Sequence, residues 1–234
     1  MIIPSRRRGL LAAIAGAALV GGALAAFHYH RLGLTLSHYD ARGHLVVARR
    51  VVDSITPGWQ QIGAVWLPLP HLLNLLPVQI DALYRNGASA VAISVIAFAI
   101  ATGAVAWIVL ALTGSALAAV AGAAVFAFNP NVLYLQATPM TEPLLLALTT
   151  VAVAMLMEWT NADGGSRTTA GPKAGTTTVG VAFALACLTR YEAWPVTACA
   201  LAAAVWVRRR SGDPWPAACR RSNVRGRRPR LFAI

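Results

Sequence analysis

Residues 88–128, ASAVAISVIAFAIATGAVAWIVLALTGSALAAVAGAAVFAF, decide the fold of this chain, because they run without a single charged side chain. The part before the turn, 88–112, exceeds the roughly 20 apolar residues that cross a bilayer core. Thr113, Gly114 and Ser115 then predict a tight turn, after which 116–128 is apolar again. The stretch predicts two membrane spans joined as a hairpin.

The composition of the whole chain agrees with a membrane location. Hydrophobic residues make up 57% of it and charged residues 12%, whereas soluble domains carry roughly 25% charged residues. The net charge is +12, and arginines concentrate after residue 208. Their position beside apolar segments favours retention on the cytoplasmic, anionic-lipid side of a membrane. We therefore expect membrane lipids as partners and no nucleic acid.

Further apolar runs complete the predicted bundle. A run at 9–27 follows three arginines and predicts a retained anchor, with a cleaved signal peptide as the alternative. Another run lies at 144–157, and 178–207 is interrupted by TRYEAWP. Because charges are costly at a bilayer centre, two short spans (178–190 and 194–207) are favoured over a single tilted helix. The sequence predicts an all-α polytopic bundle of about five to six spans.

The same runs predict a topology in the cytoplasmic membrane. The N-terminus and the basic tail, 208–234, are expected on the cytoplasmic side, and the tail is expected to be disordered or lipid-associated. The transmembrane domain then covers 1–207. A long external loop, 28–87, contains a helical pattern at 41–54, an extended stretch around Pro68 and Pro70, and a second short helix from His71.

Three charged clusters fall on one face of this topology, and ionisable groups at the ends of apolar spans are candidates for function. They are Asp40 with His38 and His44, Glu142, and Arg190 with Glu192. A carboxylate can take a proton from an attacking hydroxyl, and a second can hold a divalent cation or position the acceptor. The planar guanidinium suits a phosphate.

Each candidate also has a structural alternative. Asp40 precedes a helical pattern and is placed to cap it, and Glu142 can cap the helix that contains Pro143. Arg190 can simply pair with Glu192. The histidines lack the ligand count of a closed metal site and are better explained as interfacial residues. Arg49 and Arg50 can bind lipid headgroups, or a donor phosphate in place of Arg190.

Three stretches together resemble the integral-membrane glycosyltransferases of the GT-C fold, the superfamily of protein O-mannosyltransferases and aminoarabinose transferases. They are the loop HYDARGHLVVARRVVDSITPGWQQIGAVWLPLPHLL, the segment NPNVLYLQATPMTEPLLLAL, and LTRYEAWPV. The resemblance covers about residues 9–207. It implies transfer of a sugar from a polyprenyl-phosphate donor to an acceptor on the external face, with a divalent cation (Mg²⁺ or Mn²⁺) as an optional cofactor.

By the same resemblance, Asp40 matches the first-loop acidic residue, the catalytic base. Glu142 matches the second-loop acidic position, with an acceptor or metal role, and Arg190 falls where a donor-phosphate contact is expected. The chain departs from the family in its first-loop motif, which is a single Asp40 preceded by Tyr39 and not an acidic pair. It also ends after about six spans, as an N-terminal portion of such an enzyme would. The rival functions are a non-catalytic, truncated membrane protein and a transporter.

Overall fold

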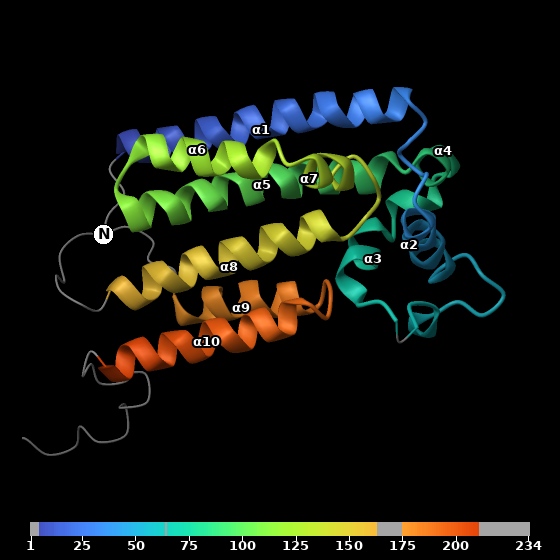
Figure 1. Ribbon diagram of the computed structural model, residues 1–234. Helices are drawn as coiled ribbons and strands as arrows, with labels where there is room; N and C mark the ends of the chain where they lie inside the picture. The colour runs from blue at the N-terminus through green and yellow to red at the C-terminus, as the bar shows by residue number, and fades with distance from the viewer. Residues whose placement is uncertain (1–4, 64, 163–174, 211–234) are drawn as a thin grey trace, which may run out of the picture.

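The computed structural model describes residues 5–63, 65–162 and 175–210, and every regular element within these ranges is helical. The all-α prediction is therefore confirmed (Figure 1). The long helices are α1 (Ser5–Arg31), α5 (Ala88–Thr113), α8 (Glu142–Ala162) and α10 (Ala193–Arg210). The shorter α-helices are α2 (Tyr39–Arg50), α3 (Pro68–Asn74), α4 (Asp81–Asn86), α6 (Ala116–Ala127), α7 (Pro130–Leu135) and α9 (Thr176–Cys187), and two 3₁₀ turns, η1 (Trp59–Gln61) and η2 (Pro77–Gln79), complete the described chain.

Three helices are long and apolar enough to cross a membrane: α1 over Arg7–Arg31, α5 over Ala88–Thr113 and α8 over Glu142–Thr160. Helices α6, α9 and α10 are apolar but shorter in their apolar part. The structure thus supports a membrane protein with at least three candidate spans among the described residues. The basic tail predicted at 208–234 lies outside those residues from position 211 onward.

Helix α5 occupies the centre of the bundle (Figure 1). It packs against α1 and α6 on one side and against α8 on the other, and α8 in turn packs against α9 and α10. Small side chains allow these close approaches, as is common between membrane helices. A Cβ on Gly103 would lie 3.2 Å from the Cβ of Ala15 on α1, and one on Gly122 of α6 would lie 3.0 Å from Val109 on α5.

The turn between α5 and α6 has the predicted form. Gly114 ends α5 in the left-handed region with a φ of 69°, where glycine avoids a steric penalty. Ser115 then caps α6, because its side chain accepts a hydrogen bond from the backbone N–H of Ala118. This two-residue turn places α6 antiparallel to α5.

The segment between α1 and α5 folds across one end of the bundle, which we call the capped end (Figure 1). Here α1 finishes, α5 and α8 begin, and α9 turns into α10. Two local predictions were wrong. The helix predicted over 41–54 ends at Arg50, and Pro68 and Pro70 lie inside α3 rather than in an extended stretch. Proline is tolerated in the first helical turn because its missing N–H would have no partner there.

Candidate functional site

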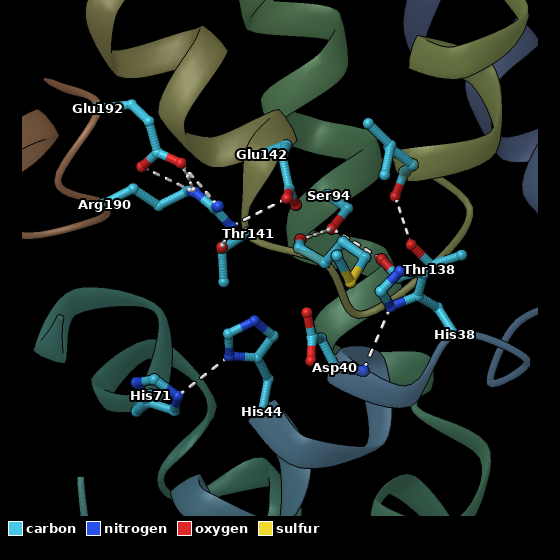
Figure 2. A network of polar contacts seen from close by, with 12 residues as sticks. His38, Asp40, His44, His71, Ser94, Thr138, Thr141, Glu142, Arg190 and Glu192 are labelled. Carbon is cyan, nitrogen blue, oxygen red and sulfur yellow. Dashed lines mark hydrogen bonds and ion pairs between the residues drawn. The ribbon is translucent and has the colours of Figure 1, made fainter. Parts of the chain in front are cut away.

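Four segments meet at the capped end and bring their polar side chains together (Figure 2). The first turns of α2 carry His38, Asp40 and His44, and α3 carries His71. The start of α8 supplies Glu142, and the turn between α9 and α10 supplies Arg190 and Glu192. Asp40, Glu142 and Arg190 are separated by long stretches of sequence, and only the tertiary fold makes them neighbours.

Arg190 is the hub of this cluster. Its Nη1 donates to Glu142 Oε1 at 2.9 Å and to the Thr141 hydroxyl at 3.0 Å. Its Nη2 and Nε donate to the Glu192 carboxylate at 2.8 and 3.2 Å. The hydrogen bonds to Glu192, followed by the charge of Glu142, raise the pKa of Arg190. The hydrogen bonds from Arg190 in turn lower the pKa of Glu192. The guanidinium is therefore held in place as a permanent cation.

Glu142 is only half used by this ion pair. Its Oε1 accepts from Arg190, whereas its Oε2 is shielded from solvent and has no hydrogen-bond partner among the described residues. A buried polar atom without a partner costs free energy and calls for an explanation. An oxygen in this state is ready to accept a hydrogen bond from a hydroxyl or to contact a cation.

The loop before α8 is buried and pinned on both sides, which fixes Thr141 and Glu142. The Gln136 amide nitrogen donates to the carbonyl of Gly22 on α1 at 3.1 Å. The Ser94 hydroxyl on α5 lies within hydrogen-bond distance of two carbonyls in the loop, those of Thr138 at 3.1 Å and Met140 at 3.2 Å. The loop thus has little freedom, and the carboxylate at its end is positioned by α1 and α5.

The turn that carries Arg190 is tied to α3 at the capped end. The backbone N–H of Leu69, in the first turn of α3, donates to the Leu188 carbonyl at the end of α9 at 3.0 Å. The indole of Trp194 donates to the Cys187 carbonyl at 3.0 Å. These two bonds satisfy carbonyls that the end of α9 leaves unpaired, and they set α3 beside the Arg190 turn.

Asp40 is not the N-cap of its helix, so the capping alternative for this residue was wrong. Helix α2 begins at Tyr39, and His38 is the cap: its Nδ1 accepts from the backbone N–H of Asp40 at 3.2 Å. Asp40 therefore sits in the first turn, where the helix dipole favours an anion. Its carboxylate has no hydrogen-bond partner among the described residues, and it extends from α2 toward the space between Glu142 and Arg190 (Figure 2).

A pair of buried histidines forms the floor of the site. The Nδ1 of His44 lies 3.2 Å from the Nε2 of His71, and both rings pack against Trp66. Burial is the main cause that lowers the pKa of both histidines. For His44, the nearby charges of His71, Arg190 and His38 lower the pKa further, to about 3. The two rings are neutral at physiological pH. His71 was not singled out as a site residue from the sequence.

Arg49 and Arg50 do not join this cluster. They lie at the far end of α2, about 14 Å from Asp40 at 1.5 Å per residue. Arg49 donates to Asp53 at 2.9 Å and to Asp81 at 2.7 Å, and it stacks on Tyr84. Its guanidinium ties α2 to α4. A donor phosphate beside Asp40 would therefore not reach Arg49.

The site has a net negative charge. Asp40, Glu142 and Glu192 set three carboxylates against the single guanidinium of Arg190, a formal charge of −2. Despite this surplus, no three His, Cys, Asp or Glu side chains in the described part of the chain are arranged to hold one metal ion.

Comparisons with protein-family models, with curated proteins and with solved structures find no match for this chain. The interpretation of the site therefore depends on its own geometry. That geometry gives one free carboxylate, one half-used carboxylate and one fixed guanidinium at the end of an apolar bundle.

The histidine pair predicts a pH-dependent stability. Because the folded pKa of His44 is about 3 and the unfolded value is about 6.5, the unfolded state binds more protons below pH 6.5. The stabilisation is complete above that pH and is lost as the pH falls toward 3. At pH 5 we expect a loss of about 2 kcal/mol.

The measurement is the unfolding temperature at pH 7.5 and pH 5, read from the fluorescence of the purified protein in detergent. The His44→Gln variant removes the titrating group and serves as the comparison. We expect wild type to lose more stability than His44→Gln over this interval. Equal losses in the two proteins would contradict a neutral, buried His44.

Proposed function

We propose that this protein is an integral-membrane glycosyltransferase that takes a sugar from a polyprenyl-phosphate donor and attaches it to an acceptor on the external face. The observation that carries the proposal is the convergence of Asp40, Glu142 and Arg190 from α2, α8 and the α9–α10 turn. Catalytic machinery needs groups held in fixed relative positions, and the buried loop and the ion-pair hub provide that here.

Each of the three residues has a step in the proposed reaction. The acceptor hydroxyl gives its proton to Asp40 while its oxygen attacks the anomeric carbon of the donor sugar. The bond between that carbon and the phosphate oxygen breaks, and polyprenyl phosphate leaves with the bonding electrons. Arg190 faces the leaving phosphate, and Glu142 accepts a hydrogen bond from the substrate through its free Oε2.

Because carboxylates outnumber the guanidinium, the donor phosphate has to displace one of them from Arg190. In the free protein Arg190 is shared between two carboxylates, and a phosphate has to compete with Glu192 for the guanidinium. Glu192 is the easier carboxylate to displace, because its side chain is 58% exposed, against 25% for Glu142, and water can replace Arg190 as its partner. We therefore propose that the donor phosphate displaces Glu192, while Glu142 stays on Arg190.

The proposed topology has six spans. Helices α1, α5 and α8 cross fully, α6 crosses with the help of α7, and α9 and α10 form a hairpin whose turn carries Arg190. The capped end then faces outward, as the arginines at the N-terminus and at 208–210 require under the positive-inside bias. An external site fits a donor whose sugar is presented at the outer surface.

Cysteine labelling in intact cells tests this topology. In a chain without native cysteines, single cysteines replace Ile55 and Asn131 toward the capped end, and Thr113 and Gly175 at the opposite end, all at exposed positions. A membrane-impermeant maleimide should label the first two and spare the last two until the membrane is opened. Labelling of Thr113→Cys from outside would overturn an external site.

The activity itself is tested in vesicles that contain the purified full chain. Synthetic polyprenyl-phosphoryl mannose, arabinose and glucose are offered as donors with a mixture of membrane lipid and peptide acceptors. Release of polyprenyl phosphate is measured by mass spectrometry. Release that depends on the protein and on the acceptors supports the proposal, and its absence for every donor contradicts it.

A further inference from the structure

The histidine pair has a single possible arrangement of its protons. The Nδ1 of His71 lies 3.0 Å from the backbone carbonyl of Leu67. A carbonyl only accepts, so this nitrogen carries the proton. In a neutral ring the other nitrogen is then a bare lone pair, and the Nε2 of His71 must accept. The donor is the Nδ1–H of His44, 3.2 Å away.

This chain of bonds fixes the second nitrogen of His44. With its proton on Nδ1, neutral His44 carries a lone pair on Nε2. That atom has no hydrogen-bond partner among the described residues. In Figure 2 the His44 ring rises from α2 beside the Asp40 carboxylate, below Thr141 and Arg190. The His44 ring also borders a cavity of about 20 Å³ under the site, large enough for one water molecule.

This series of hydrogen bonds also limits what His44 can do. A proton relay needs a group at its far end that can take or give a proton, and here the series of hydrogen bonds ends on the backbone carbonyl of Leu67. His44 is therefore an acceptor of hydrogen bonds and not a path for protons. A neutral acceptor does not attract a phosphate, and it suits a hydroxyl.

From this geometry we infer that His44 is a substrate-binding residue, whose Nε2 accepts a hydrogen bond from a hydroxyl of the sugar or of the acceptor. The inference names a contact within the site of the proposed function, and it depends on that function for the class of substrate. His71 acts through His44, as a positioning residue that selects the tautomer.

Two substitutions separate binding from structural support. Asparagine at position 44 places its amide nitrogen near the former Nδ1 and can still donate to His71, but it has nothing at the position of Nε2. Glutamine reaches that position with an oxygen acceptor. A binding role predicts that His44→Gln keeps most of kcat/KM, whereas His44→Asn loses about ten- to thirtyfold, the value of one lost hydrogen bond. His30→Asn, in the last turn of α1, is the control substitution.

A structural role predicts the reverse order, because asparagine preserves the contact with His71. Equal or better transfer by His44→Asn than by His44→Gln, with both variants folded, would therefore overturn the inference. Unfolding temperatures at pH 7.5 establish that the variants are folded.

A second measurement does not depend on transfer. The full chain, labelled with ¹⁵N-histidine, is placed in lipid nanodiscs and titrated with methyl mannoside, methyl arabinoside and methyl glucoside up to about 100 mM. The nitrogen shifts should show an unprotonated Nε2 on His44, which moves on addition of at least one glycoside. A proton on Nε2, or no movement with any glycoside, would overturn the inference. If the vesicles show no transfer, the proposed function fails, and the titration still decides the role of His44.

Discussion

Asp40→Asn should reduce transfer by about 10²- to 10⁴-fold, which is the range that general-base catalysis contributes. The amide has the size of the carboxylate but cannot take a proton from the acceptor hydroxyl. Since Asp40 has no hydrogen-bond partner among the described residues, and α2 is capped by His38 instead, the substitution removes the proposed base without breaking a hydrogen bond. The measurement is the release of polyprenyl phosphate from the vesicles described above.

Asp53→Asn is the matched control for this prediction. Asp53 belongs to the same segment, but it pairs with Arg49 at the other end of α2, and its side chain is 61% exposed. Transfer by this variant should stay within about twofold of wild type, because exposed ion pairs contribute little. If Asp40→Asn behaves like Asp53→Asn, Asp40 is not the base.

Arg190→Gln should destabilise the folded protein by about 2–3 kcal/mol and abolish transfer. The guanidinium is the shared partner of Glu142 and Glu192, so its removal leaves two carboxylates without their cation, and one of them is only 25% exposed. Breaking a fully buried ion pair from one side costs about 3–5 kcal/mol, and the partial exposure of this cluster lowers that value. Chemical or thermal unfolding of the purified protein gives the measurement.

The double variant Arg190→Gln with Glu142→Gln should recover part of the lost stability, since the unpaired carboxylate is removed as well. A coupling free energy of about 1 kcal/mol or more between positions 142 and 190 is expected from residues in contact. Arg49→Gln provides the comparison: its partners Asp53 and Asp81 are more than half exposed, so a much smaller loss of stability than for Arg190→Gln is expected. If the losses of stability in the two single variants simply add in the double variant, Arg190 and Glu142 do not stabilise the fold as a pair.

Local signals in the sequence were sufficient for the helical framework. The uncharged run through α5 and α6 specified two helices, because a long apolar segment satisfies its backbone polar groups only within a helix when it lies in lipid. Gly114 and Ser115 specified the turn between them through their own conformational and capping preferences. The break between α9 and α10 followed from the cost of burying Arg190, a property of one residue in one environment.

Two boundaries at the capped end differ from those that the sequence pattern predicted. The helix from Tyr39 stops at Arg50 and not at 54, where the backbone N–H of Val52 bonds to the carbonyl of Arg49, three residues back, in a tightened last turn. The two prolines in α3 resembled an extended segment, and the tertiary bond from Leu69 to Leu188 favours the helical alternative instead.

For the site, the sequence by itself determined which charged residues stand at the ends of apolar segments, and hence that Asp40, Glu142 and Arg190 share one end of the bundle. Only the tertiary structure decided the partners of each: Arg190 between two glutamates, Arg49 withdrawn to Asp81, and His44 on His71. The physical reason is that apolar periodicity and charge cost act along one segment, whereas a hydrogen bond between distant segments depends on the packing of α2, α3, α8 and α9 in three dimensions.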